Sequence, residues 1–286
     1  MILKASALKL VNHEDVSVSE QIQNEKSEKE ISKDYGKCNL ENSVLISSNA
    51  GQDYYINCVN NKTKSFPFIE TIAVEMMNHN AGLKGVLSDF RSMYASKEKN
   101  RKFNICLNGI DESDKRFILG LFIRDLNCIF MEIHYDRCSN CLSGELTDNT
   151  KAQMFLTGRY LEIAIKKYTE EILNDLSIQY DKEFRIYNNA EVFNNGEIIH
   201  EFDLVIENAS DNIYYIVEVK SGKWFRDFDK VNRIGKEIGI IPNRFLLVDA
   251  HLIEGQKETI FYFCDFFATD LKGYRDTLIE MLEQDI

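Results

Sequence analysis

The sequence predicts an α/β protein of two domains, one over residues 1–150 and one over residues 151–286. Short apolar runs of strand length alternate along the chain with longer segments in which apolar residues recur three or four positions apart. This alternation is typical of an α/β layer. A chain of 286 residues is long enough for two domains that each bury a core. The polar stretch 142–153 is the expected boundary between them.

In the first half, four strands and two helices are expected after a polar N-terminal segment. Residues 13–37 carry almost no large apolar side chains and are expected to be exposed. Asn108-Gly109 supplies a turn before the second helix, and Asp111 or Ser113 can cap its first turn. The strand–helix–strand order favours some parallel pairing. The strands are expected at 43–48, 53–59, 102–107 and 128–134, and the helices at 66–83 and 111–126.

The second half is expected to open with a helix over 158–173, in which one apolar stripe faces the core and Glu162 lies beside that stripe. Three antiparallel strands follow, because an Asn-Gly turn near residue 196 and a polar turn at 207–212 separate them. A helix, two more strands and a last helix complete this half. The strands are expected at 183–193, 201–206, 214–220, 244–250 and 259–266, and the later helices at 225–239 and 274–284.

The composition is that of a soluble globular protein, with 44% hydrophobic and 28% charged residues. No apolar run approaches the ~20 residues of a membrane helix, and the N-terminus lacks the apolar stretch of a secretory signal. Seven cysteines, an odd number scattered along the chain, favour reduced thiols and a cytoplasmic location. The net charge of −12 argues against a protein that coats nucleic acid through bulk charge.

One segment departs from this acidic average. Between Lys220 and Arg244, seven basic residues stand against three acidic ones, a local excess of +4. A solvated helix face is one interpretation, and a surface that contacts nucleic-acid phosphates is the other. The candidate phosphate-binding residues are Lys223, Arg226, Lys230 and Arg233.

Two predicted strands carry charge among valines and isoleucines. Glu218 and Lys220 are two positions apart, so their side chains project from the same face of the strand. Pairing of the neighbouring strand brings Asp203 close to Glu218. Two carboxylates at the edge of a core repel each other, and a divalent cation such as Mg²⁺ resolves the conflict. Lys220 can then orient or deprotonate a water, or neutralise charge on a phosphate. The alternative is an exposed ion pair of Glu218 with Lys220, worth only ~0–1 kcal/mol.

This pattern resembles the PD-(D/E)xK, or restriction-endonuclease-like, nuclease superfamily. The resemblance covers about residues 155–270, and it implies a C-terminal nuclease domain with a mixed central sheet. Phe202 stands where the family pattern usually has proline. The matching residues are Glu162 in the preceding helix, Asp203 in a strand, and Glu218-Val219-Lys220 in the next strand.

The resemblance implies catalysis with Mg²⁺ or Mn²⁺. Asp203, Glu218 and the backbone carbonyl of Val219 would be the metal ligands. Lys220 would activate the attacking water, and Glu162 would be an outer ligand or orienting group. The implied function is hydrolysis of phosphodiester bonds in DNA, with RNA as the alternative substrate, in defence against foreign nucleic acid. A repair or recombination nuclease, and a non-catalytic protein that binds nucleic acid or senses a nucleotide, stay open as other functions.

The first half carries a fainter resemblance. Residues 105–136 are similar to the last β-α-β unit of CARF domains, which are Rossmann-like sensors of cyclic oligoadenylates fused to such nucleases in CRISPR-associated defence. This implies a regulatory or dimerisation domain, a cyclic oligoadenylate activator and a homodimer. The acidic loop 108–113 does not favour a phosphate, and a purely structural domain is the alternative. Cys138 and Cys141 have zinc-knuckle spacing, but no second pair completes four ligands.

Overall fold

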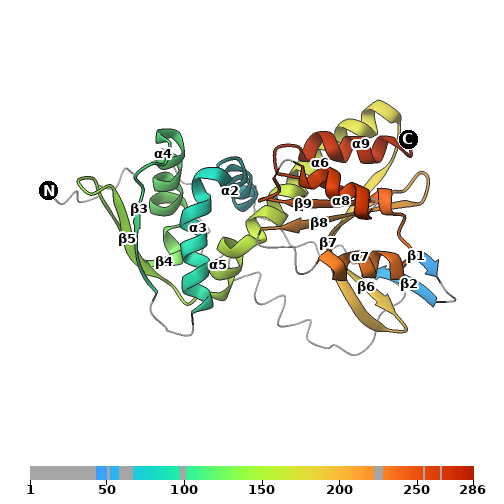
Figure 1. Cartoon of the computed structure of the whole chain (residues 1–286), viewed down its shortest axis with the longest axis horizontal. Coiled ribbons are helices and arrows are strands. Elements are labelled where there is room, and N and C mark those ends of the chain that lie inside the picture. The colour runs from blue at the N-terminus through green and yellow to red at the C-terminus, as the bar shows by residue number, and fades with distance from the viewer. Residues whose placement is uncertain are drawn as a thin grey trace, which may run out of the picture.

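The computed structural model describes residues 43–49, 52–57, 67–96, 101–221, 228–253, 255–264 and 266–286. It confirms the mixed α/β class and shows two lobes that lie side by side (Figure 1). The first lobe contains a three-stranded sheet and the second a seven-stranded sheet. No helix within these ranges has the length and apolar character needed to cross a membrane. The prediction that residues 13–37 are exposed falls outside the described ranges.

The seven-stranded sheet is mixed, as the sequence predicts for the second half. Its strand order is β1-β2-β6-β7-β8-β9-β10. Neighbouring strands are antiparallel from β1 to β8, whereas β8, β9 and β10 are parallel. The strands are β1 Ser43–Asn49, β2 Gln52–Asn57, β6 Phe184–Asn194, β7 Glu197–Asn208, β8 Ile213–Lys220, β9 Phe245–Asp249 and β10 Phe267–Thr269.

The antiparallel pairing of β7 with β8 brings the predicted site strands together, and a hairpin joins β6 to β7. Asn195 and Gly196 both have positive φ, 51° and 83°, as the expected two-residue turn requires. Along β8, Val217 and Val219 pack into the core on one side of the sheet, and Ile216 packs into the core on the other. Because β8 is covered on both faces, its sequence is nearly continuous in apolar residues.

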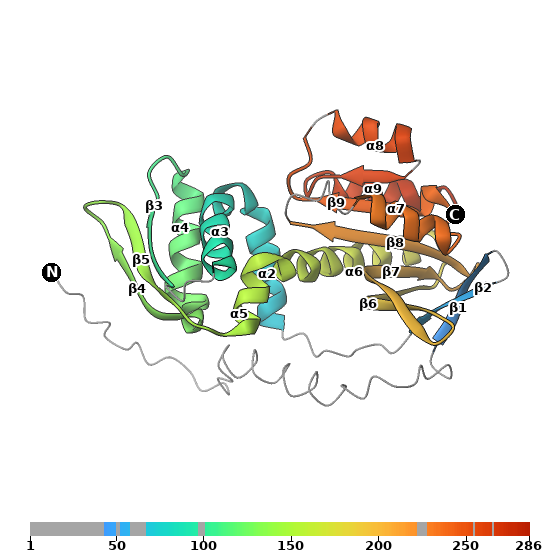
Figure 2. The same cartoon turned by 60° about the horizontal axis from the view of Figure 1, so that its bottom comes forward.

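Helices cover both faces of this sheet (Figure 2). α6 and α9 pack on one face, where Leu161, Ala164 and Ile165 of α6 are fully buried, as the predicted stripe requires. α7 and α8 pack on the other face through Ile234 and Ile260. The helices are α6 Tyr160–Tyr180, α7 Phe228–Glu237, α8 Gln256–Cys264 and α9 Tyr274–Glu283.

The first lobe packs helices against an antiparallel sheet of order β3-β5-β4. The Phe90 ring meets Phe103 and Phe122 edge-on, with ring centroids 5.2 and 5.5 Å apart. Asp111 caps α4 as expected, since its carboxylate accepts a hydrogen bond from the Ser113 backbone N–H at 2.8 Å. The elements are α2 Pro67–Asn78, α3 Asn80–Ala95, β3 Lys102–Cys106, α4 Glu112–Gly120, β4 Phe130–Asp136, β5 Cys141–Leu146 and α5 Thr150–Met154.

The parallel pairing expected in the first half is not found among its described residues. β3 and β4 run in the same direction, but the antiparallel strand β5 lies between them and pairs with both. The polar stretch 142–153 therefore contains a strand as well as a connection. Leu142 and Leu146 of β5 are buried while the residues between them are only partly covered, and two leucines are too few to signal a strand in the sequence.

Two further expectations are corrected. β1 and β2, counted with the first half, join the sheet of the second lobe through pairing of β2 with β6. The segment 259–266, expected as a strand, is largely helix α8, in which Ile260 is buried while Phe261 and Tyr262 are 50% and 79% exposed. Because β9 and β10 are adjacent and parallel, a crossover must connect them, and α8 supplies it.

Candidate active site

Asp203 of β7 and Glu218 of β8 meet where the two strands separate. Regular pairing of β7 with β8 ends at Leu204 opposite Val217. Beyond that pair, Oδ2 of Asp203 accepts a hydrogen bond from the backbone N–H of Val219 at 2.7 Å. The backbone N–H of Asp203 in turn donates a long hydrogen bond of 3.5 Å to Oε2 of Glu218. The carboxylates thus take the place of ladder hydrogen bonds and lie side by side, as predicted.

Lys220 completes this arrangement. Its Nζ lies 2.5 Å from Oε1 of Glu218, and the two side chains project from the same face of β8. The Glu218 side chain is 4% exposed and that of Lys220 is 28% exposed. An ion pair on an open sheet face, the alternative interpretation, does not describe a glutamate that is almost completely buried.

Burial and the charge of neighbouring acids oppose ionisation of Asp203 and Glu162. Burial, and then the charges of Glu218 and Glu162, raise the pKa of Asp203 well above its usual range, although Lys220 acts in the opposite direction. Burial also raises the pKa of Glu162, against the lowering effects of Arg159 and Lys220. All four predicted catalytic residues therefore belong to one electrostatic cluster.

The donor set suits a hard cation held by few protein ligands. Within the described ranges, no three His, Cys, Asp or Glu side chains lie close enough to hold a metal ion together. Asp203 and Glu218 supply two carboxylates, and the backbone carbonyl of Val219 points toward β7, as its N–H does. Mg²⁺ is commonly bound by one or two carboxylates and several waters. A divalent cation here would also relieve the repulsion that raises the pKa of Asp203.

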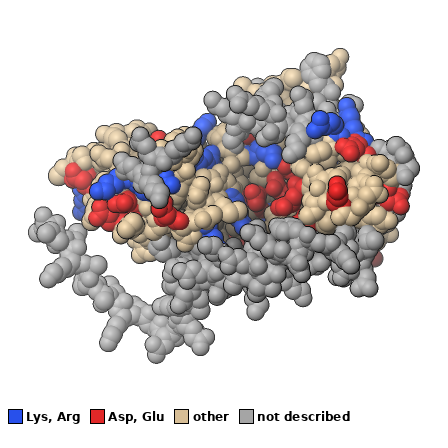
Figure 3. Space-filling model, turned by 90° about the horizontal axis from the view of Figure 1, so that it is seen from below, with Lys and Arg blue, Asp and Glu red and all other residues tan. Residues whose placement is uncertain are grey.

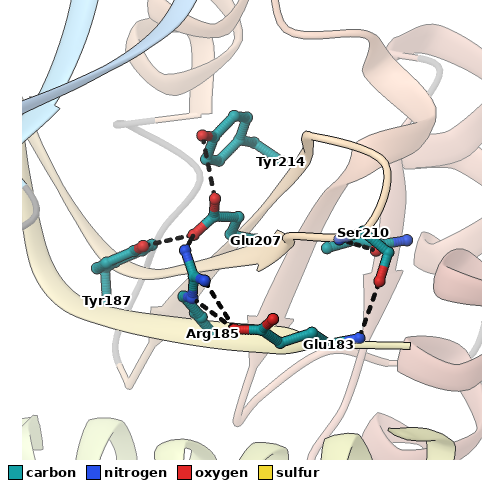
Figure 4. A network of polar contacts seen from close by, with 7 residues as sticks. Glu183, Arg185, Tyr187, Glu207, Ser210 and Tyr214 are labelled. Atoms are coloured by element: carbon teal, nitrogen blue, oxygen red, sulfur yellow. Dashed lines mark hydrogen bonds and ion pairs between the residues drawn. The ribbon is translucent and has the colours of Figure 1, made fainter. Parts of the chain in front are cut away.

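A buried acid on the same strand as Asp203, Glu207, shows what a purely structural carboxylate looks like in this protein (Figure 4). Glu207 is 6% exposed. It accepts hydrogen bonds from the hydroxyls of Tyr187 at 2.5 Å and Tyr214 at 3.5 Å, and it lies 3.6 Å from Arg185. Two tyrosine hydroxyls and an arginine thus surround Glu207, and none of them belongs to the group of Asp203, Glu218 and Lys220. Asp203 has one backbone donor and two acidic neighbours instead.

The basic segment after Lys220 is described only in part. Lys223 and Arg226 lie outside the described residues, and Lys230 belongs to α7. Arg233 is exposed on α7, which covers the same face of the sheet as Lys220. Seen from below, acidic side chains gather near the middle of the molecule with Lys and Arg beside them (Figure 3). The roles of the four basic residues in binding phosphates stay predictions.

Sequence reasoning missed the residues that fasten the end of β8. The carbonyl of Ser221, directly after Lys220, accepts a hydrogen bond from Arg91 of α3 at 2.8 Å and lies 3.1 Å from Nε2 of His251. The Ser221 hydroxyl donates to the carbonyl of Thr157 at 3.1 Å. The first lobe and the start of α6 are thereby tied to the strand that carries Glu218 and Lys220. Arg91 is 130 residues from Ser221, so no local pattern could reveal this contact.

Asp249 is another buried acid that the sequence did not reveal as a candidate. It ends β9, opposite Lys220 in the parallel register, and is fully buried. Its Oδ1 accepts a hydrogen bond from the His251 backbone N–H at 2.8 Å, while Oδ2 has no partner within the described ranges. Burial raises the pKa of Asp249 to about 6, against weaker lowering by His251 and Lys84.

We expect Asp249→Asn to stabilise the protein more at pH 8 than at pH 5. Because the pKa of Asp249 is raised from 3.8 to about 6 in the folded state, the wild type loses stability as the pH rises from about 3.8 to about 6, and roughly half of this loss is already present at pH 5. The asparagine keeps the acceptor for His251 and never ionises. The free energy of unfolding of Asp249→Asn should exceed that of the wild type by roughly 3 kcal/mol at pH 8. Urea unfolding at both pH values measures it, and an equal difference at pH 5 and pH 8 would contradict the assignment.

The zinc-knuckle spacing does not produce a metal site within the described ranges. Cys138 and Cys141 are free thiols. Cys106 of β3, which lies opposite Cys141 in the register of β3 and β5, is a free thiol too. No group of three suitable ligands includes them.

Comparison with known proteins relates the chain to several solved structures, among them the two named here. No family model and no curated protein sequence matches it. Protein VC1899 from Vibrio cholerae is 15% identical, with a TM-score of 0.51, over 82% of this chain and 58% of that one. Can2 from Sulfobacillus thermosulfidooxidans, solved in complex with cyclic tetra-adenylate, is 14% identical, with a TM-score of 0.50, over 75% of this chain and 56% of that one. The chain shares their fold. It spans a little over half the length of each.

Proposed function

We propose that the chain is a metal-dependent nuclease that hydrolyses phosphodiester bonds. The observation that carries this proposal is the group of buried Glu218 with partly buried Asp203 and Lys220 at the point where β7 and β8 separate. Two carboxylates and an amine have no structural need to converge there, since a buried acid of this protein can be satisfied by tyrosines and arginine, as Glu207 is. The resemblance to the PD-(D/E)xK superfamily assigns the same three residues.

In this proposal Asp203, Glu218 and the carbonyl of Val219 hold Mg²⁺ or Mn²⁺. When bound, the ion polarises the scissile phosphate and lowers the pKa of a bound water. Lys220, which contacts Glu218 and is more exposed than it, can orient the attacking water or neutralise charge on the phosphate. Glu162, whose pKa is raised mainly by burial and which interacts electrostatically with Lys220 and Glu218, would orient water or accept a proton.

Nucleic acid is the proposed substrate, with DNA preferred to RNA. The protein carries a net charge of −12, so attraction must be local. The basic segment after Lys220 provides it, and Arg233 and Lys236 on α7 are described residues of this segment that face solvent. Contacts of this kind position a strand without reading its sequence.

A cyclic oligoadenylate is the proposed activator, and a homodimer is the proposed assembly. The similarity of residues 105–136 to CARF domains suggests this ligand class, and Can2, which shares the fold, was solved with cyclic tetra-adenylate. Defence against foreign nucleic acid is the setting that joins such an activator to a nuclease. The contact of Arg91 with the carbonyl of Ser221 gives the first lobe a direct connection to the catalytic strand.

The test is cleavage by the purified protein. Labelled duplex DNA, single-stranded DNA and RNA are incubated with Mn²⁺, Mg²⁺ or EDTA, with and without cyclic tetra-adenylate. We expect metal-dependent cleavage that EDTA abolishes, and stimulation by the cyclic nucleotide. The rival function is a binding or sensor protein without turnover. Absence of cleavage under every condition, together with no calorimetric signal for Mn²⁺, would establish the rival.

A further inference from the structure

A cleft of about 570 Å³ lies between the two lobes, and none of the four predicted catalytic residues lines it. We call it the inter-lobe cleft; its walls are α2 and α3 on one side and the segments that follow β9 and β10 on the other, where the lobes meet in Figure 1. Pockets of about 300–1,000 Å³ hold small ligands and occur preferentially between domains and beyond the carboxyl ends of parallel strands. The inter-lobe cleft meets both conditions.

Positive charge dominates the inter-lobe cleft although the protein is acidic. Lys84, Lys272 and Arg275 line it, against a single carboxylate, Asp270. That carboxylate is already engaged by Lys257, whose Nζ lies 3.1 Å from it. Arg275 is likewise engaged, because its Nη2 lies 2.9 Å from Oδ2 of Asp175. Lys84 and Lys272 make no salt bridge or hydrogen bond within the described ranges, and Lys84 acts on the buried Asp249 only through its charge, so both ammonium groups can contact an anion in the cleft.

The remaining walls are mainly apolar and aromatic. They include Met77, Tyr168, Leu252 and Tyr274. The Tyr168 hydroxyl is fixed by a hydrogen bond of 3.1 Å to the side-chain oxygen of Asn78, which also lines the cleft. A few fixed polar groups on an apolar lining favour a ligand with a flat organic part, and the two lysines favour a negative charge at one end.

We propose that the inter-lobe cleft binds a small organic phosphate of the size of a mononucleotide. Its phosphate lies on Lys84 and Lys272, and its organic part lies against Tyr168 and Leu252. The volume suits one nucleotide better than a ring of four, which distinguishes this ligand from a cyclic tetra-adenylate. Lys84 belongs to α3, as does Arg91, so an occupant would contact the helix that is bonded to Ser221.

Adenosine 5′-monophosphate (AMP) is the probe, titrated calorimetrically into the full-length protein in EDTA. Because the readout is AMP binding, the result does not depend on whether the protein cleaves nucleic acid. We expect a dissociation constant between about 10 µM and 1 mM, with weaker binding of adenosine and of inorganic phosphate. The double variant Lys84→Glu/Lys272→Glu should raise the dissociation constant for AMP at least about tenfold, because two charge-assisted contacts become repulsive.

Two controls separate the cleft from other sites. The control Lys115→Glu/Arg116→Glu on α4 changes the net charge by the same amount as Lys84→Glu/Lys272→Glu, but its two residues lie outside the cleft. This control variant should bind AMP like the wild type. Asp203→Asn, which changes the catalytic cluster without an expected loss of stability, should also bind AMP normally, which excludes that cluster as the site. Absence of AMP binding, equal binding of adenosine, or equal loss in the α4 variant would each overturn the proposal.

Discussion

Lys220→Met is expected to slow nucleic-acid cleavage by at least about 100-fold, the usual contribution of a positioned proton-transfer group or cation. The same variant should still bind Mn²⁺, because the proposed metal ligands are Asp203, Glu218 and the Val219 carbonyl. Affinity for Mn²⁺ should even rise, since the Lys220 ammonium lies 2.5 Å from Oε1 of Glu218 and competes for that oxygen. Single-turnover cleavage and calorimetry with Mn²⁺ give the two readouts.

Loss of Lys220 should also lower the stability of the metal-free protein. Glu218 is 3% exposed, and without Lys220 it becomes a buried carboxylate beside Asp203 with no cation in contact. Addition of Mn²⁺ should restore stability by mass action, by about 2.7 kcal/mol at 100 times the dissociation constant. Lys182→Met is the matched control, because Lys182 pairs with Asp211 elsewhere on the second lobe. Unchanged cleavage by Lys220→Met would remove Lys220 from the mechanism.

Asp203→Asn is expected to slow cleavage by roughly 10³-fold, because the several kcal/mol that a bound metal ion contributes to the transition state are lost. It should raise, not lower, the stability of the metal-free protein. The asparagine side-chain oxygen can still accept the hydrogen bond from Val219, while the repulsion among buried carboxylates that raises the pKa of Asp203 disappears. The gain should be on the order of 1 kcal/mol, or roughly 2–4 °C in the unfolding temperature.

The stability effects of Asp203→Asn and Lys220→Met thus have opposite signs, and a general loss of folding cannot produce that result. Glu207→Gln provides a further comparison on the same strand. It should lower stability by about 1–2 kcal/mol, because two tyrosine hydroxyls and Arg185 lose their charged partner. Its cleavage rate should be unchanged. If Asp203→Asn were less stable than the wild type with or without Mn²⁺, Asp203 would be a structural residue like Glu207.

The core of the site could be predicted because its signals are local. The spacing of Glu218 and Lys220 fixes a common face on any strand, and the Asn195-Gly196 turn fixes the hairpin that carries Asp203. The apolar stripe of α6 likewise follows from helical spacing alone. These features need only a few neighbouring residues to be recognised.

The remainder depends on contacts between distant segments. β2 pairs with β6 across more than a hundred residues, and Arg91 reaches Ser221 from the other lobe. No local sequence pattern in these segments indicates which distant segment each one contacts. The helix α8 was mistaken for a strand because a short apolar run fits both structures, and only the parallel order of β9 and β10 decides between them. Asp249 is seen as a candidate only once β9 lies beside β8.

The most direct test of the account is the location of a bound metal ion. Crystals of the protein soaked in Mn²⁺ should show one anomalous scattering peak within about 2–2.5 Å of carboxylate oxygens of both Asp203 and Glu218, and Asp203→Asn crystals should not show it. A wild-type crystal with no peak between these two residues, or with Mn²⁺ bound only elsewhere, would contradict the proposal that they form a catalytic metal site.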